Sequence, residues 1–283
     1  MGDTPEIEIE GIIFKREDLN PSGSVKDRGI SYQLNWAKKE GIKDLVLSSS
    51  GNAAISACFF GKKFGLELFI FVSPKINKKK LAIIKKYPYR VFITNRPVSD
   101  AIKFAKKNNF YHLRLSTDPR GAIGCCEIAR EISESQGNQG NQGNRRVDAV
   151  FFPVSSGTTL MGVAQGFKKL SFLPQLHIVQ TTAVCSLAGK FDKDFVPTAS
   201  SLASALVAKY VPKKQEIIQL VKDSGGWGWV VSDEEIVNAD GWLKEHGVIT
   251  SFEGAASLAA VRKAKNKGWK LGKTVCLLTG KRY

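Results

Sequence analysis

Short apolar segments alternate with longer helical patterns along nearly the whole chain, and this alternation most constrains its fold. Continuous apolar runs with helices between them are typical of strands in a parallel sheet that is covered on both faces. The sequence therefore predicts an α/β protein built on parallel sheets. The apolar segments span residues 45–50, 68–73, 90–94 and 111–116, and then 149–156, 176–182, 229–232 and 275–279.

The two sets of apolar segments predict two α/β domains. We expect a small domain over residues 38–121, inserted into a large domain made of residues 1–37 and 122–283. The segment SQGNQGNQGNRR (135–146) separates the two sets of strands. Its polar triplet repeat has no means of packing a core, so we predict a flexible surface loop there rather than a domain boundary.

Composition excludes several protein classes. Hydrophobic residues make up 43% of the 283 residues and charged residues 24%, an ordinary globular mix that argues against disorder. The cysteines form no CxxC pair and the three histidines are far apart, so we expect neither a disulfide framework nor a metal site. No apolar run is long enough to cross a membrane, and MGDTPEIEIE lacks the regions of a signal peptide. We therefore expect a cytoplasmic protein with no membrane partner.

The positive charge of the chain is unusual. Lys and Arg number 42 and Asp and Glu 26, which gives a net charge of +16. Such a charge is compatible with a nucleic-acid partner, with solubility, or with attraction of small anions. In residues 78–86 and 261–270 the lysines alternate with apolar residues at helical spacing, as on the wet faces of amphipathic helices. No RNA-binding signature is present, so we expect a small-molecule partner and no nucleic acid.

A lysine opens a predicted helix in the stretch KREDLNPSGSVKDRG (15–29). Asn20 to Ser24 form a turn of small and polar residues, and Lys26 follows it. A helix N-terminus disfavours a cation, and a lysine that forms a Schiff base has to react as the neutral amine. An ordinary helix start with a solvated lysine explains this stretch equally well.

Two further turns place hydroxyl and small residues between a strand and a helix. Such turns present backbone N–H groups to anions, although ordinary N-capping gives the same pattern. The turn in 48–57 suits a carboxylate, and the turn in 153–162 suits a phosphate without the spacing of a Walker A loop. Their residues are Ser49, Ser50, Gly51, Asn52 and Ala53, and Ser155, Ser156, Gly157, Thr158 and Thr159.

The last apolar segment, VCLLTGKRY (275–283), ends in a fourth such turn. It delivers Thr279 and Gly280 to the carboxyl end of a predicted strand. Ligands of α/β sheets bind at that end. Thr279 is therefore a candidate binding residue.

In this order, the four turns resemble those of the fold-type II pyridoxal-phosphate enzymes, and the resemblance extends from Lys15 to Tyr283. It implies two parallel-sheet α/β domains, with pyridoxal 5'-phosphate in the cleft between them and the larger domain binding most of it. The resemblance makes Lys26 the Schiff-base lysine and Asn52 the partner of the cofactor's 3′ oxygen. It implies that Ser155 to Thr159 bind the cofactor phosphate, that Thr279 faces the pyridine nitrogen, and that Ser49 to Ala53 bind the substrate carboxylate.

Within this family the sequence is most similar to threonine synthases, in residues 15–29, 48–54, 223–236 and 251–261. That similarity implies a lyase that makes threonine from O-phosphohomoserine, and it suggests a homodimer. Such a substrate needs a second anion site. Arg120 falls where related synthases place a phosphate-binding arginine, with Lys15 and Ser116 as assisting residues.

Three alternatives stay open at this point. One is an RNA-associated basic protein, which would fit the net charge of +16. A β-eliminating or β-replacing enzyme that acts on serine, threonine or an activated serine would need no second phosphate site. Arg120 would then be a solvated loop residue. Ser155 and Thr158 stand where the family usually has glycine, so a pyridoxal-phosphate-binding protein without turnover is the alternative from another class.

Overall fold

The computed structural model describes residues 2–49, 51–135 and 147–283, and it confirms the α/β class with parallel sheets. The chain divides into two compact units, one of residues 20–124 with Tyr283, the other of residues 2–19 and 125–282. The smaller unit thus starts earlier than the 37/38 boundary that we predicted and ends at Gly124. The flexible loop predicted for 135–146 lies outside the described residues except for Ser135.

The smaller unit holds a four-stranded parallel sheet in the order β5-β4-β3-β6. Each strand is joined to the next by a helix, as the alternating sequence pattern predicts. Its elements are α1 (Lys26–Lys39), β3 (Asp44–Ser48), α2 (Asn52–Phe64), β4 (Glu67–Val72), α3 (Lys78–Ile84), β5 (Arg90–Ile93), α4 (Pro97–Asn108), β6 (Tyr111–Leu113) and α5 (Pro119–Ile123).

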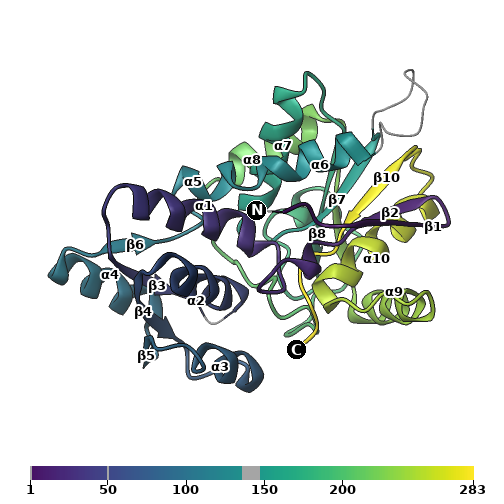
Figure 1. Ribbon diagram of the computed structural model, residues 1–283. Helices are drawn as coiled ribbons and strands as arrows, with labels where there is room; N and C mark the ends of the chain where they lie inside the picture. Colours follow the sequence, from purple (N-terminus) through teal and green to yellow (C-terminus); the bar gives the residue numbers. More distant parts are fainter. Residues whose placement is uncertain (1, 50, 136–146) are drawn as a thin grey trace. The chain divides into compact units, whose positions relative to one another are not determined.

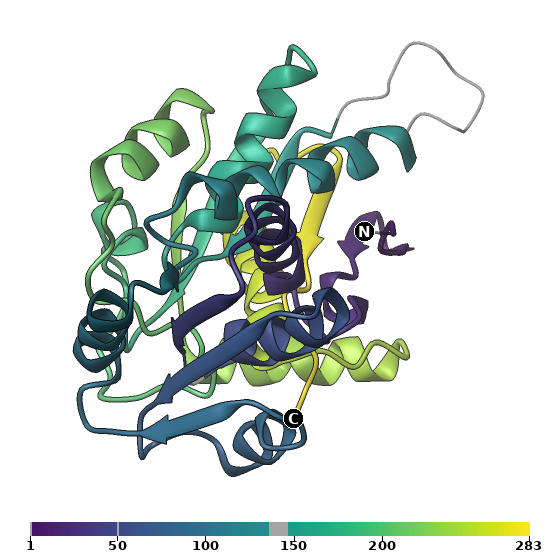
Figure 2. The same ribbon diagram turned by 60° about the vertical axis from the view of Figure 1, so that its left-hand side comes forward.

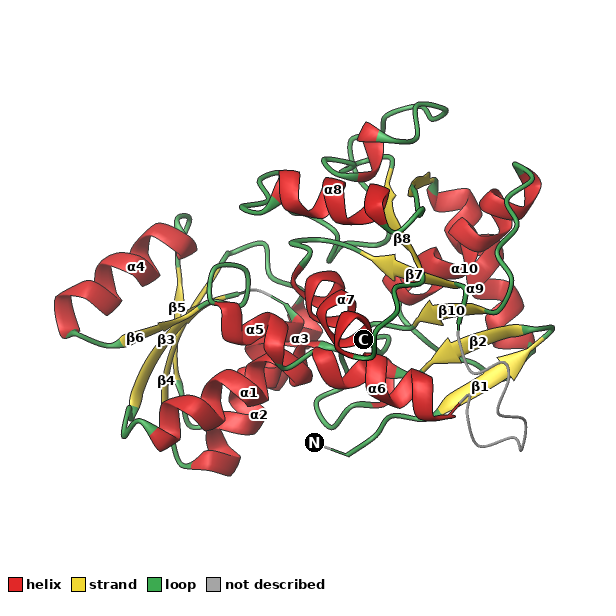
Figure 3. Cartoon of the chain, turned by 90° about the horizontal axis from the view of Figure 1, so that it is seen from above, coloured by secondary structure: helices red, strands yellow, loops and turns green. Residues whose placement is uncertain are grey.

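Side chains along β3 point alternately to the two faces of this sheet. Leu45 and Leu47 are buried in a core with residues of α1 and α2. Val46, between them, packs in a second cluster with Phe69, Phe71 and residues of α4. This period of two is the geometry of a strand, and both faces are apolar because helices cover both (Figure 3).

The larger unit holds a six-stranded sheet in the order β1-β2-β10-β7-β8-β9. The pair β1–β2 is antiparallel and the other neighbours are parallel. Its elements are β1 (Glu6–Ile9), β2 (Ile12–Lys15), the 3₁₀ helix η1 (Glu17–Leu19), α6 (Cys126–Ser135), β7 (Ala149–Pro153), α7 (Thr158–Lys169), β8 (Gln175–Thr181), the 3₁₀ helix η2 (Ala188–Lys190), α8 (Lys214–Asp223), β9 (Gly228–Val231), α9 (Asp233–Glu245), α10 (Phe252–Asn266) and β10 (Thr274–Leu277).

Helices lie on both faces of this sheet, α9 and α10 on one and α6, α7 and α8 on the other (Figure 1). The last strand of the chain, β10, lies inside the sheet between β2 and β7, yellow in Figure 2. Strands β7, β8, β9 and β10 are parallel, so their carboxyl ends share one edge of the sheet. No helix in the described part of the chain has both the length and the apolar character needed to span a membrane.

Candidate functional site

Hydrogen bonds to Asp27, the residue after Lys26, stabilise the turn that precedes this lysine. The buried carboxylate of Asp27 accepts a hydrogen bond from Ser22 N at 2.7 Å and another from Ser22 Oγ. Gly23 takes a φ of 93°, a conformation that glycine adopts easily, and its N–H donates to Asn20 O at 2.7 Å. The half-buried Lys26 is the first residue of α1. The backbone position of Lys26 is therefore fixed by local contacts.

Helix α2 of the same unit begins at Asn52, and its N-cap residue is Gly51. Gly51 has no side chain with which to cap the helix, and its own N–H donates to Ser49 Oγ at 3.2 Å. The side-chain oxygen of Asn52 is buried, and among the described residues it has no hydrogen-bond partner. A buried amide without a partner is costly, so this atom indicates a bound polar group. Of the other predicted residues here, Ser50 lies outside the described residues and Ala53 is half-buried.

The predicted phosphate loop of the larger unit connects β7 to α7. Gly157 is the N-cap residue of α7 and takes a φ of 83°. A Cβ at this position would lie 2.2 Å from Ile217 Cδ1 of α8, so the loop needs glycine for both backbone conformation and space. Ser156 Oγ and Thr158 Oγ1 lie 3.1 Å apart, and Ser155 and Thr159 are half-buried. The loop thus presents hydroxyl groups at a helix start that no N-cap side chain occupies, which suits an anion.

Thr279 lies two residues beyond β10 and is half-buried. The chain after it is fixed, because the carbonyl oxygen of Gly280 accepts from Ser251 N at 2.8 Å and from Thr250 Oγ1 at 3.1 Å. Strands β10 and β7 are neighbours in the sheet. Thr279 and the phosphate loop therefore follow the carboxyl ends of two adjacent parallel strands, the usual position of ligand groups in such sheets.

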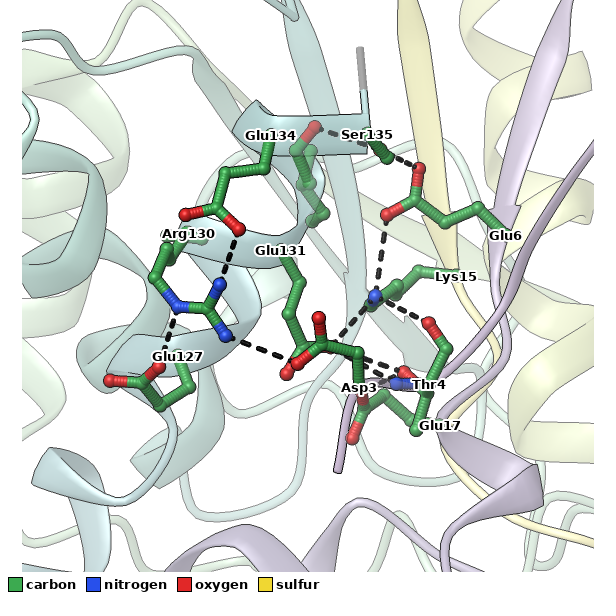
Figure 4. A network of polar contacts seen from close by, with 12 residues as sticks. Asp3, Thr4, Glu6, Lys15, Glu17, Glu127, Arg130, Glu131, Glu134 and Ser135 are labelled. Carbon is green, nitrogen blue, oxygen red and sulfur yellow. Dashed lines mark hydrogen bonds and ion pairs between the residues drawn. The ribbon is translucent and has the colours of Figure 1, made fainter. Parts of the chain in front are cut away.

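Lys15, which we expected to assist substrate binding, lies in a buried polar network of the larger unit (Figure 4). Its ammonium contacts Thr4 O at 2.8 Å, Glu131 Oε2 at 2.8 Å and Glu6 Oε1 at 3.3 Å. The ammonium thus donates to one backbone carbonyl and lies within ion-pair distance of two carboxylates. The side chain is 1% exposed. The structure therefore gives Lys15 a stabilising role within the larger unit and leaves the substrate role unsupported.

Arg120, the predicted substrate-phosphate residue, is the second residue of α5 in the smaller unit. Its guanidinium carbon lies 3.6 Å from the centroid of the Trp36 ring, and its Nη1 lies 3.2 Å from Asp118 Oδ1. Its side chain is 35% exposed. Ser116, the other predicted residue here, is half-buried in the turn that precedes α5. Arg120 is therefore an oriented side chain with a carboxylate beside it, rather than a solvated loop residue.

Asp118 is itself held by several donors. Burial raises its pKa, but hydrogen bonds from the Tyr111 hydroxyl and from Arg120 N outweigh burial and keep the pKa of Asp118 below the usual value. Burial and the hydrogen bond to Asp118 raise the pKa of Tyr111. Asp118 is therefore ionised at neutral pH, and its charge offsets part of the charge of Arg120.

The predicted residues thus form two sets, each within one unit. The smaller unit holds Lys26, the Ser49–Ala53 turn, Ser116 and Arg120, and the larger unit holds the Ser155–Thr159 loop and Thr279. Sequence reasoning missed two polar residues that support these sets. Asp27 directly follows Lys26, and Gln180 is a polar residue within the apolar segment 176–182. A polar residue in a predicted buried strand was the available signal for Gln180.

A family model with the description "Pyridoxal-phosphate dependent enzyme" matches residues 2–280. The threonine synthase of Methanocaldococcus jannaschii is 26% identical over 97% of this chain and 71% of its own length. The human L-serine dehydratase/L-threonine deaminase is 26% identical over 88% of this chain and 76% of its own length.

Solved structures with the same fold include maize serine racemase, with a TM-score of 0.85 and 19% identity over 99% of this chain and 88% of that one. A fungal L-serine ammonia-lyase from Rhizomucor miehei has a TM-score of 0.80 and 19% identity over 99% of this chain and 94% of that one. Relatives of similar fold thus carry names of different reactions.

Proposed function

The chain belongs to the family of pyridoxal-phosphate dependent enzymes, and from this premise we propose that it is a threonine synthase. The reaction takes O-phosphohomoserine and water and yields threonine and inorganic phosphate. The support comes from threonine synthases that match 97% of the chain, and from Arg120, an oriented cation in the smaller unit. The choice of reaction depends on the oriented guanidinium of Arg120.

The residues of both units fit the cofactor. The buried side-chain oxygen of Asn52 has no hydrogen-bond partner among the described residues, and a hydroxyl group on the cofactor ring would satisfy it by donating. The Ser155–Thr159 loop offers hydroxyl groups and the start of α7 to a phosphate. In this proposal Lys26 attaches the cofactor, Asn52 contacts its ring, the loop binds its phosphate, and the Thr279 hydroxyl faces the pyridine nitrogen.

Bound pyridoxal phosphate supplies the electron sink for bond breaking next to the amino-acid Cα. The Ser49–Ala53 turn binds the substrate carboxylate through the N-terminus of α2, and this orients the Cα–H bond. Lys26 removes the proton at Cα and returns a proton to the carbon chain, because its amine lies at the attachment point of the cofactor. The phosphate group leaves from Cγ and water adds at Cβ.

Arg120 would bind the phosphate group of the substrate. A guanidinium that is oriented by an aromatic ring loses little conformational entropy when it forms a bidentate contact with an oxyanion. The carboxylate of Asp118 competes for the same cation, at 3.2 Å from Nη1. We expect the dianionic phosphate to add to this pair by using the donors of Arg120 that Asp118 does not engage.

The ion pair between Arg120 and Asp118 also supports a second candidate function. An arginine whose charge is already offset by a carboxylate is not required to meet a substrate phosphate, and a serine or threonine substrate carries none. The human serine dehydratase/threonine deaminase matches 88% of the chain. The alternative is therefore an enzyme that eliminates or replaces the β-substituent of serine, threonine or an activated serine.

Product analysis separates the candidates. The purified full-length protein, loaded with pyridoxal phosphate, is incubated separately with O-phosphohomoserine, serine and threonine. A threonine synthase releases phosphate and threonine in equal amounts from the first substrate. Ammonia and a 2-oxo acid from serine or threonine, with no phosphate release, would establish the second candidate instead. Bound cofactor with no product from any substrate would indicate a binding protein without turnover.

A further inference from the structure

Gln180 is a fully buried polar residue in strand β8 of the larger unit. Its side chain makes three hydrogen bonds. Nε2 donates to Val154 O at 3.2 Å, and Oε1 accepts from Leu187 N at 2.8 Å and from Ala188 N at 2.9 Å. One amide side chain thus connects the end of β7 to the segment at the start of η2.

The partners of this amide determine its orientation. Leu187 and Ala188 present N–H groups, which require an acceptor, and Val154 presents a carbonyl oxygen, which requires a donor. A neutral amide offers both in one side chain of this length. A carboxylate would satisfy the two N–H groups but would place a buried negative charge against the carbonyl oxygen. This position therefore favours glutamine over an ionised glutamate.

Val154 is the residue directly before the Ser155–Thr159 loop. Its N–H donates to Val179 O at 2.9 Å, and its carbonyl oxygen accepts from Gln180. Both backbone polar groups of Val154 are therefore fixed on strand β8. On its other side the loop is bounded by Ile217, against which Gly157 packs. The direction in which the loop leaves the sheet thus depends on the contact with Gln180.

The segment at the other end of the Gln180 amide is rigidly anchored. A Cβ on Gly228 of β9 would lie 2.8 Å from Ala188 Cα, so the start of η2 lies directly against this strand. The carboxylate of Asp192 accepts from Val230 N at 3.1 Å and pairs with Lys263 at 2.8 Å. Gln180 therefore ties the stem of the loop to a fixed part of the sheet.

We propose that Gln180 is a positioning residue for cofactor phosphate, because its amide sets the path of the Ser155–Thr159 loop from Val154. This inference rests on the proposed function only in that the loop binds the phosphate of pyridoxal phosphate. Gln180 acts through Val154 and does not itself contact the cofactor. The consequence is specific, since the loss of this contact weakens binding of the phosphate group and leaves binding of the pyridoxal ring unchanged.

The test compares two cofactors that differ only in the phosphate. The dissociation constants of pyridoxal phosphate and of pyridoxal are measured by absorbance titration of the full-length protein, for wild type and for Gln180→Met. In the variant the thioether fills a similar volume, but it donates nothing to Val154 O and offers no strong acceptor to the N–H groups of Leu187 and Ala188. We expect the affinity for pyridoxal phosphate to fall by about tenfold or more, as for a lost hydrogen bond to a charged group, and the affinity for pyridoxal to change by less than about twofold.

Thr182→Val is the matched control. Thr182 is also buried near the end of β8, and its hydroxyl lies 2.8 Å from Thr198 Oγ1 rather than near Val154. The Thr182→Val substitution should leave the affinities for pyridoxal phosphate and for pyridoxal unchanged. Equal losses for the two ligands in Gln180→Met, or an unchanged preference for pyridoxal phosphate, would overturn the role of Gln180. A wild-type protein that binds both ligands equally would instead overturn the assignment of the phosphate to this loop.

A measurement on the wild type keeps the test decisive if the variant fails to fold. Amide hydrogen exchange is followed at Leu187 and Ala188, whose N–H groups donate to Gln180. Coupling through Gln180 predicts slower exchange at both residues with bound pyridoxal phosphate than with bound pyridoxal. Identical exchange with the two ligands would contradict the proposal.

Discussion

The guanidinium of Arg120 stacks on the indole ring of Trp36, with 3.6 Å between the guanidinium carbon and the ring centroid. The two residues lie on α5 and α1 of the smaller unit. Cation–π contacts contribute about 0.5–2 kcal/mol, depending on exposure. The stack therefore orients a cation whose side chain is only 35% exposed to solvent. An oriented arginine can serve as an anion-binding group, and this provides the first test of the proposed reaction.

Arg120→Ala should reduce kcat/KM for O-phosphohomoserine by roughly 100-fold or more, because a bidentate charge-assisted contact is worth a few kcal/mol. Deamination of serine or threonine should barely change, since neither carries a phosphate. Initial rates of phosphate release and of 2-oxo acid formation measure the two activities.

Arg90→Ala is the matched control, because Arg90 also lies over an aromatic ring of the smaller unit, that of Phe69, at 5.6 Å. It removes a similar stacking contact without removing the predicted phosphate ligand. Equal loss of phosphohomoserine turnover in both variants would mean that stability, and not phosphate recognition, explains the effect of Arg120.

Lys26→Ala should abolish covalent fixation of the cofactor. Borohydride reduction of the wild-type protein should add the cofactor mass to the peptide that contains Lys26. This lysine has a fixed backbone position, because a hydrogen bond from Ser22 to Asp27 stabilises the turn before it. Lys39→Ala, at the exposed end of the same helix, should behave like the wild type. Mass spectrometry of the digested proteins identifies the labelled peptide in the wild type and in each variant. Label on any other lysine would show that the predicted site is misplaced.

Thr159→Val should weaken cofactor binding by about 1–3 kcal/mol, the usual cost of losing a hydrogen bond to a charged group. Threonine and valine have nearly the same shape, so packing around the half-buried side chain is preserved. Equilibrium titration with pyridoxal phosphate measures the loss, and titration with pyridoxal provides the reference. An unchanged dissociation constant for pyridoxal phosphate would mean that Thr159 does not bind the phosphate.

The sequence predicted the fold class because the apolar segments are continuous and the helices between them are amphipathic. Leu45 to Leu47 show why, since the buried side chains on both faces of β3 require helices on both sides. The sheet order was not predictable. Strand β10 inserts between β2 and β7, and this depends on pairings between residues far apart in the sequence. Local patterns carry no information about such partners.

The candidate site was predictable where local chemistry defines it. Gly157 precedes a helix and has a positive φ, and the hydroxyl residues beside it reveal the loop in the sequence. The role of Lys15 was not predictable, because its acceptors come from Thr4, Glu6 and Glu131 and meet only in the folded unit. Gln180 is a similar case, since its three partners lie on two different segments.

Lys15→Met should destabilise the protein by about 3–5 kcal/mol, because removal of the cation leaves buried carboxylates without compensation. The side chain of Glu131 is 2% exposed and that of Glu6 10%. Urea unfolding measures the change, and Lys39→Met, on the exposed end of α1, should stay within about 0.5 kcal/mol of the wild type. A stable Lys15→Met protein with a raised KM for its substrate would restore the substrate role that the sequence suggested.

His177 is a fully buried titratable residue on β8, stacked on Phe151 with 4.4 Å between ring centroids. The indole N–H of Trp229 can only donate, and it lies 3.1 Å from His177 Nδ1, so Nδ1 is the acceptor. His177 Nε2 then carries the proton and donates to Gln175 Oε1 at 3.2 Å. Burial lowers the pKa of His177 from 6.5 to about 3. The native protein thus holds this imidazole neutral.

This burial predicts a pH dependence of stability between pH 6.5 and about 3. In that window the unfolded chain binds a proton at His177 and the native state does not, so the free energy of unfolding falls as the pH falls. The contribution of one such group approaches about 1.4 kcal/mol per pH unit. His177→Phe removes the titrating group, and the lost hydrogen bond from Trp229 costs the same at every pH. Urea unfolding at pH 7 and pH 5 should therefore show a smaller stability difference for His177→Phe than for the wild type, and identical differences would contradict a neutral buried His177.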